Sequence, residues 1–150
     1  MKRKILVLPQ RQALEYLSRP ESDPEKVCLI AVCNPGVFPS VLRDKARFCA
    51  FLEFDDAPDE KTAYAFGLTL LDDVQAHWAG ETLLEALNEG CLEFVFSCEG
   101  GRSRSAGLAQ GFARFLEEEG IPYQLIHAKA PTPNPLACER LYLALKRLAQ

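Results

Sequence analysis

The amino-acid sequence predicts a single α/β domain over residues 1–150, with a mostly parallel sheet of four to five strands and helices on both faces. Short apolar runs alternate with segments of helical periodicity, which is the pattern of repeated βαβ units. The run VCLIAVC at 27–33 is almost wholly apolar, as expected of a strand covered on both faces. Hydrophobic residues make up 48% of the chain and charged residues 25%, which is typical of one folded domain with a full core.

The individual elements follow from local signals along the chain. Strands are expected at 4–8, 27–33, 48–54, 94–96 and 123–127, because each is a short apolar run bounded by turn residues. Helical spacing predicts helices at 11–17, 61–78, 81–88, 104–119 and 135–148. Gly80 is expected to separate the second helix from the third. Asn134 and Pro135 are the expected N-cap and first residue of the last helix.

The charge and the N-terminal residues exclude several classes of protein. A formal net charge of −4 argues against a nucleic-acid-binding protein, so any anion site must be a local focus of positive charge. The basic residues at 2–4 precede only four apolar residues, which are too few for a signal peptide. No run approaches the roughly 18 apolar residues of a membrane span. We therefore expect a cytoplasmic protein whose partners include neither nucleic acid nor a membrane.

Six cysteines stand at positions 28, 33, 49, 91, 98 and 138. The first three lie inside apolar strand-like runs, where cysteine behaves as a small hydrophobic residue, so a disulfide framework is not expected. The chain has no Cys-x-x-Cys pair, and both histidines are distant from the cysteines in sequence. A zinc site is therefore not expected, and we predict neither a metal nor a cofactor.

The stretch from Cys98 to Ser105 is the most informative about function, because it joins the fourth strand to a long helix. Such a loop turns its backbone N–H groups inward and, together with the helix dipole, binds a dianion. The two glycines allow close approach of the backbone and a positive φ. Arg104 can hold two phosphate oxygens with its planar guanidinium. We expect a phosphate to be bound by Arg104 and by the backbone of Glu99, Gly100, Gly101, Arg102 and Ser103.

Cys98 lies at the end of the strand, beneath the same donors, which favour its thiolate. A thiolate below a bound phosphate is placed for nucleophilic attack on phosphorus. Ser105 is placed to donate a hydrogen bond to the sulfur and to ease its departure in a second step. The side chain of Glu99 must point outward, since it would otherwise oppose an anion. We expect phosphate, sulfate, vanadate or tungstate to occupy this loop.

The pattern Cys98-x-x-Gly101-x-x-Arg104-Ser105 after a strand resembles the signature of the cysteine-dependent protein tyrosine and dual-specificity phosphatases. The resemblance is to a compact bacterial type and extends from LEFDD at 52–56 to NPLACERL at 134–141. It implies a protein tyrosine phosphatase-like fold and metal-independent hydrolysis of a phosphate monoester through a cysteinyl-phosphate. It also implies that the partner is a phosphorylated protein or a small phosphorylated molecule. The family usually has histidine before the nucleophile, where this chain has Ser97.

A phosphatase of this family also needs an acid that protonates the leaving oxygen and then deprotonates water. The resemblance puts this acid just after the strand that precedes the helices, at Asp55 or Asp56, with a slight preference for Asp55. Asp59 is an outside candidate.

Other polar residues are interpreted as structural. Asp72 and Asp73 are expected at the solvated surface of a helix whose apolar side carries Phe66 and Val74. His127 ends a strand at the sheet edge where sites lie and could reach the pocket, although packing explains it better. His77 and Trp78 are interpreted as core or edge residues.

Two other functions remain open. The main alternative is a catalytically weak or inactive phosphate-recognition module of the same fold, which the absence of the usual histidine favours. The other is sulfur transfer on a rhodanese-like loop, or arsenate reduction. Rhodanese-type loops place their arginine one position earlier, where this chain has Ser103. Arsenate reductases carry their loop near the N-terminus, whereas about two thirds of this chain precedes Cys98.

Overall fold

The computed structural model describes residues 2–37 and 39–150. Five parallel strands form one sheet in the order β3-β2-β4-β1-β5, which confirms the predicted α/β class. The strand order brings together segments that are distant in the sequence, and it places β4 near the middle of the sheet. The strands are β1 (Arg3–Pro9), β2 (Val27–Cys33), β3 (Phe48–Glu53), β4 (Glu93–Cys98) and β5 (Tyr123–His127).

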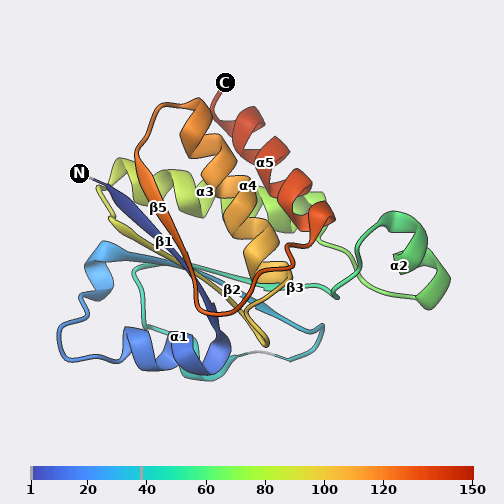
Figure 1. Cartoon of the computed structure of the whole chain (residues 1–150), viewed down its shortest axis with the longest axis horizontal. Coiled ribbons are helices and arrows are strands. Elements are labelled where there is room, and N and C mark those ends of the chain that lie inside the picture. Colours follow the sequence, from blue (N-terminus) through green and yellow to red (C-terminus); the bar gives the residue numbers. More distant parts are fainter. Residues whose placement is uncertain (1, 38) are drawn as a thin grey trace.

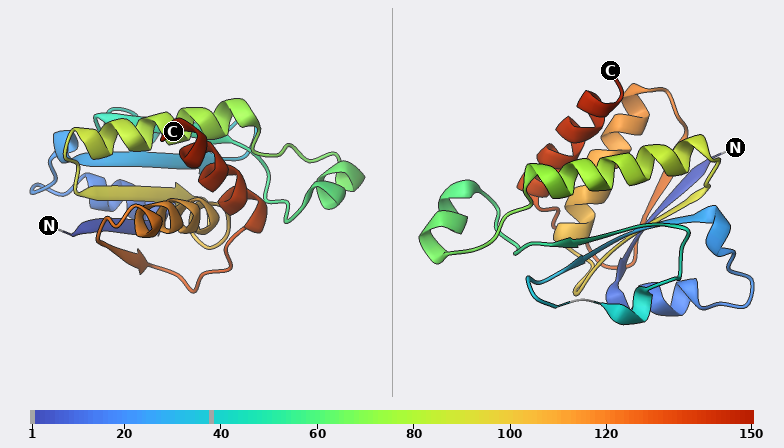
Figure 2. Two further views of the ribbon diagram at one scale, coloured as in Figure 1. Left: turned by 90° about the horizontal axis from the view of Figure 1, so that it is seen from above. Right: turned by 180° about the vertical axis from the view of Figure 1, so that it is seen from behind.

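Helices cover both faces of the sheet, as predicted (Figure 1). One face is covered by α1 (Gln10–Leu17), and the other by α3 (Asp73–Asn88), α4 (Arg104–Glu118) and α5 (Pro135–Leu148). A short helix, α2 (Glu60–Phe66), projects from the body of the molecule (Figure 2). Two 3₁₀ turns lie on either side of β2, at Pro24–Lys26 and Ser40–Leu42. None of the helices formed by the described residues has the length and apolar character required to cross a bilayer.

The sheet separates two apolar cores, because side chains alternate between its faces along each strand. On β1, Ile5 and Val7 belong to the larger core, which also contains residues of α3, α4 and α5. Leu6 and Leu8 point the other way and belong to a smaller core that contains buried residues of α1. Both faces of the strand are therefore buried, which is why its sequence is a continuous apolar run.

The segment predicted as one helix at 61–78 is instead two helices, α2 and α3. Gly67 ends α2 with a φ of +64°, in the left-handed conformation common at helix C-termini. Asp72 and Asp73 are exposed, as predicted, but Asp72 lies before the helix rather than within it. It is the N-cap of α3 and accepts a hydrogen bond from the Gln75 N–H at 2.8 Å. Phe66 and Val74 are exposed and do not form the predicted apolar side.

Gly80 does not separate two helices, because it lies inside α3. A Cβ at this position would stand 2.8 Å from Cδ1 of Leu148, so the glycine allows α3 and α5 to pack closely. The predicted helix at 81–88 is therefore part of α3. His77 is exposed and pairs with Glu81 at 3.3 Å, and Trp78 is 43% exposed, so neither is a core residue.

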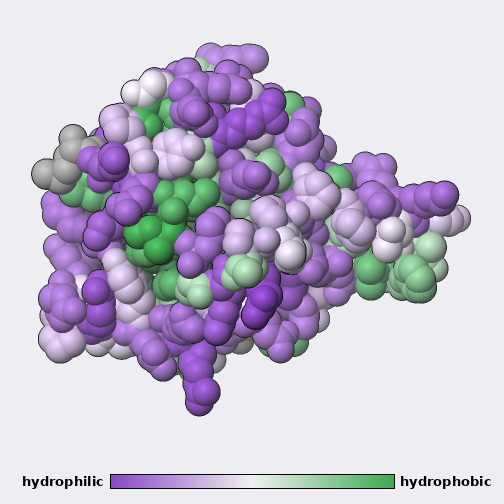
Figure 3. All heavy atoms as spheres, viewed as in Figure 1, coloured by the Kyte–Doolittle hydropathy of each residue, from purple (hydrophilic) through white to green (hydrophobic). Residues whose placement is uncertain are grey.

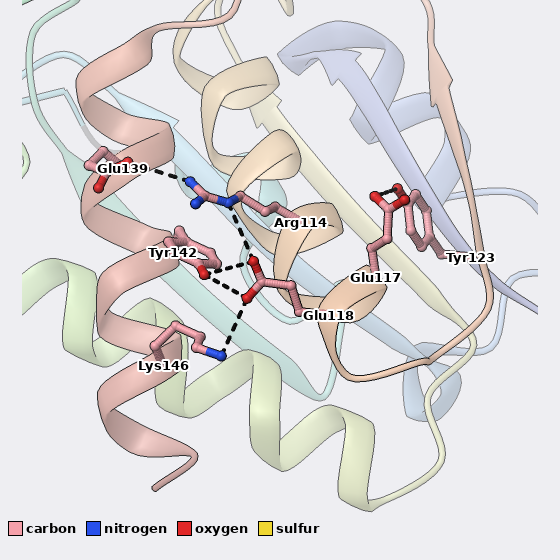
Figure 4. Close-up of polar contacts among 7 residues, drawn as sticks. All are labelled: Arg114, Glu117, Glu118, Tyr123, Glu139, Tyr142 and Lys146. Carbon is pink, nitrogen blue, oxygen red and sulfur yellow. Dashed lines mark hydrogen bonds and ion pairs between the residues drawn. The ribbon is translucent and has the colours of Figure 1, made fainter.

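Glu118 links α4 to α5 at the surface of the molecule (Figure 4). Its carboxylate accepts hydrogen bonds from the Tyr142 hydroxyl at 2.6 and 2.8 Å and pairs with Lys146 at 3.3 Å and Arg114 at 3.6 Å. The Tyr142 hydrogen bond holds the pKa of Glu118 below its ordinary value, and Glu118 raises the pKa of Tyr142. The two ion pairs join side chains that are 38–51% exposed, so each adds little stability. The Tyr142 ring is buried, so its hydroxyl contact ties Glu118 on α4 to the body of α5.

Apolar side chains remain exposed at two places on the visible face (Figure 3). One lies over the edge strand β5, where Leu125 and Ile126 are half-buried. The other is the projecting helix α2, where Tyr64 and Phe66 are 93% and 75% exposed. Most of the remaining visible face is hydrophilic.

We predict that Phe112→Ala lowers the free energy of unfolding by about 3–5 kcal/mol, because it removes a fully buried ring from the larger core. The ring of Phe112 lies 5.0 Å from that of Phe94 and 5.8 Å from that of Phe96. Phe66→Ala is the matched control and should change this free energy by less than about 0.5 kcal/mol, because Phe66 is exposed. Urea denaturation measures both variants, and equal losses would contradict the described core.

Candidate functional site

The predicted anion-binding loop turns between β4 and α4, because Cys98 is the last residue of the strand and Arg104 the first of the helix. Gly101 has a φ of +66°, and a Cβ there would stand 2.5 Å from the backbone nitrogen of Pro9. The loop is thus packed against the end of β1. Gly100 has no positive φ, and a Cβ there would meet nothing within 4 Å. The conformational requirement predicted for both glycines therefore holds only for Gly101.

Cys98 is 3% exposed, and its sulfur faces polar groups of the loop and of α4. The Gly101 N–H donates a hydrogen bond to Sγ at 3.3 Å. The Ser105 Oγ lies 3.0 Å from Sγ, so the predicted contact between this hydroxyl and the sulfur is present. The Cys98 sulfur therefore lies among the donors of the predicted anion-binding loop.

The two neighbours of Cys98 in the sequence have different surroundings. Ser97 is buried, and in the sheet it lies opposite Leu8 of β1 and Ala31 of β2. Successive side chains of a strand point to opposite faces of the sheet, so the Ser97 side chain points away from the face that carries Cys98. Glu99 is exposed, as expected for an acidic residue in an anion-binding loop. Arg102 is also exposed.

Arg104 is held by the ends of two strands. Its Nη1 donates to Oδ1 of Asn34 at 2.8 Å, just after β2, and to the carbonyl oxygen of Phe54 at 2.9 Å, just after β3. Both bonds use Nη1, which leaves Nε and Nη2 as the pair that can hold two oxygens of a ligand. Asn34 was not predicted as a site residue; its only signal is a polar residue directly after a buried strand.

The structure brings Asp56, rather than Asp55, into contact with the loop. Oδ1 of Asp56 accepts hydrogen bonds from the Ser103 hydroxyl at 2.7 Å and from Nδ2 of Asn134 at 2.8 Å. Oδ2 of Asp55 instead accepts from the Thr69 N–H at 2.8 Å, in the segment between α2 and α3. The geometry therefore favours Asp56 as the acid, against the preference expressed from the sequence.

The other polar residues considered from the sequence either cap helices or lie on another strand. Asp59 caps α2, and its hydrogen bonds from Thr62 lower its pKa. His127 lies on β5, which β1 separates from β4, and burial lowers its pKa. Asp72 caps α3, as described above.

Asn134 has a larger role than the predicted cap of α5. Its Oδ1 accepts from the Ala137 N–H at 3.0 Å, which is the cap, but its backbone N–H donates to the carbonyl oxygen of Ser103 at 2.9 Å. A Cβ at Gly107 of α4 would stand 2.4 Å from the Asn134 carbonyl oxygen, so the two backbones touch. The spacing of Gly107 and Gly111 on one face of α4 is the sequence signal that could have indicated this contact.

No protein-family model, curated protein or solved structure matches the chain. The residues of the loop and the geometry around them therefore carry the functional argument.

We predict that Gly101→Ala lowers the free energy of unfolding by at least about 2 kcal/mol. An L-residue in the left-handed region costs roughly 1–2 kcal/mol, and the added methyl group would overlap the backbone of Pro9. Gly100→Ala is the matched control and should change the free energy by no more than about 0.5 kcal/mol, because its Cβ meets open space. Urea denaturation compares the two, and a harmless Gly101→Ala would contradict the described packing.

We also predict that iodoacetamide at pH 7 alkylates Cys98 before any other cysteine. Burial raises the pKa of the other five thiols, to about 12 for Cys49, so their reactive thiolates form only as the pH rises. Mass spectrometry of peptides after limited reaction identifies the labelled residue, and tungstate should protect it. First reaction at any of the other five cysteines would be inconsistent with this assignment.

Proposed function

We propose that the protein hydrolyses phosphate monoesters, of proteins or of small molecules, through a covalent phosphate on Cys98. The observation that carries the proposal is the meeting of four groups around one loop. They are the Cys98 sulfur, the Gly101 N–H, the Arg104 guanidinium and, through Ser103, the Asp56 carboxylate. A nucleophile, anion donors and a proton donor are the parts that such hydrolysis requires.

In the first step, the Cys98 thiolate attacks phosphorus as the bond to the ester oxygen breaks. Asp56 gives its proton to the leaving oxygen, so the alcohol departs neutral. The loop amides and the free nitrogens of Arg104 hold the non-bridging oxygens while their charge is redistributed. A hollow of about 280 Å³ beside Asp56, lined also by Ser103, Asn134 and three prolines, offers room for the alcohol.

In the second step, water attacks the cysteinyl-phosphate, and the Asp56 carboxylate accepts a proton from that water. The sulfur–phosphorus bond breaks and releases orthophosphate. The sulfur departs as a thiolate, which Ser105 can stabilise because its Oγ lies 3.0 Å away. The enzyme returns to its starting state, with Asp56 protonated and Cys98 ionised.

A phosphate-recognition module is the second candidate, and Ser97 is the observation that favours it. Its short side chain is buried between strands and faces away from the Cys98 side of the sheet. It therefore supplies none of the support that a histidine at this position gives the loop in the resembling phosphatases. Such a module would bind oxyanions without turning them over.

We predict metal-independent hydrolysis of aryl phosphates in the presence of EDTA, abolished by Cys98→Ser because the nucleophile is lost. For phenyl phosphate, Asp56→Asn should lower kcat/KM by about 10²–10⁴-fold, the range for loss of a general acid. Asp55→Asn is the matched control, because its amide oxygen can still accept from the Thr69 N–H, and it should stay within about tenfold of the wild type.

Two other outcomes would change the proposal. If there is no turnover but tungstate still binds, the recognition module replaces the enzyme. If there is neither turnover nor tungstate binding, both proposals are wrong. A larger loss in Asp55→Asn than in Asp56→Asn would overturn the assignment of the acid while leaving the reaction in place.

A further inference from the structure

Asn134 uses more of its polar groups than a helix cap requires. The side chain is 3% exposed, and its Oδ1 accepts the capping hydrogen bond from Ala137. Its Nδ2 donates to Oδ1 of Asp56 at 2.8 Å and to the carbonyl oxygen of Ala57 at 2.9 Å. Its backbone N–H donates to the carbonyl oxygen of Ser103 at 2.9 Å. One buried residue on α5 thus contacts both the loop and the segment that carries the acid.

The two donors to Asp56 act on the same oxygen. The Ser103 hydroxyl and the Asn134 amide both donate to Oδ1. When the carboxyl group is protonated, Oδ1 is therefore the carbonyl oxygen, which accepts hydrogen bonds. The proton of the neutral acid then belongs on Oδ2. Because Asp56 lies in an exposed loop, its carboxyl group would otherwise rotate among several orientations.

We propose that Asn134 is a positioning residue, which holds Asp56 with Oδ2 directed to the leaving oxygen. The inference rests on the phosphatase function proposed above and adds the element that sets the geometry of proton transfer. Asn134 does not touch the reacting atoms. It acts by orienting the carboxyl group that does.

The position of Asn134 is itself determined by backbone contacts. Cβ atoms at Gly107 and Gly111 would stand 2.4 Å from the carbonyl oxygen of Asn134 and 2.6 Å from that of Cys138. These glycines therefore bring the first turn of α5 against α4, within reach of the Ser103 carbonyl oxygen. The nucleophile loop and the acid are held in register through a third segment of the chain.

The test is Asn134→Ser, since serine still caps a helix but is too short to reach Asp56 and Ala57. We expect kcat/KM for phenyl phosphate to fall about 10²-fold, because its leaving phenolate needs a proton. For para-nitrophenyl phosphate the fall should stay within about threefold, because this weakly basic phenolate departs without one. Across a series of aryl phosphates, log(kcat/KM) of Asn134→Ser should depend more steeply on the pKa of the leaving phenol than log(kcat/KM) of the wild type does.

Two controls separate positioning from folding. Asp72→Ser is the equivalent cap substitution on α3, away from the site, and should leave the leaving-group dependence unchanged. The double variant Asp56→Asn/Asn134→Ser should be no slower than Asp56→Asn alone, because Asn134 acts through Asp56. If Asn134→Ser melts below the assay temperature, Asn134→Asp is measured in the same way, since it keeps the capping oxygen and removes the amide donor.

The outcomes distinguish the two proposals. Equal losses for all aryl phosphates, or additive losses in the double variant, would show that Asn134 is only structural and would leave the phosphatase function standing. If the wild type hydrolyses no aryl phosphate, or if Cys98→Ser retains the activity, the phosphatase function fails and the role of Asn134 fails with it.

Discussion

The candidate site depends on the close approach of the α4 and α5 backbones at Gly107 and Gly111. Any Cβ at Gly107 would stand 2.4 Å from the carbonyl oxygen of Asn134, so a side chain there would push the first turn of α5 outward. Asn134 would then lose its backbone contact with Ser103 and its side-chain contact with Asp56. The absence of two side chains therefore determines where Asn134 lies relative to the loop and to Asp56.

The parallel sheet explains why one loop can gather so many contacts. The carboxyl ends of parallel strands meet at a single edge, where sites in such sheets are found. The end of β1 supports Gly101, the residue after β2 and the residue after β3 hold Arg104, and β4 ends at Cys98. Each of these four strands thus contributes one part of the site. The exposed helix α2 lies outside this arrangement, and its two aromatic side chains add nothing to the core.

The sequence predicted the fold well because strands in this protein are short apolar runs with clear boundaries. The prediction was wrong over 61–78, where apolar spacing suggested one helix. Gly67 adopts a left-handed conformation that ends α2, and Asp72 caps a new helix, α3. The Asp72 and Gln75 spacing is a capping signal that could have shown the break. The loop could be predicted because its residues are contiguous. The contact between Asp56 and Asn134 could not, because this hydrogen bond joins residues 78 positions apart.

The partners of Asp56 suit the role of acid and base that we propose for it. Ser103 and Asn134 both donate to one oxygen, so they fix the orientation of the carboxyl group. Because both act on Oδ1, the same arrangement leaves Oδ2 to carry the proton in the first step. In the second step it stabilises the carboxylate, which then accepts a proton from water. One fixed geometry can thus support both halves of the proposed reaction.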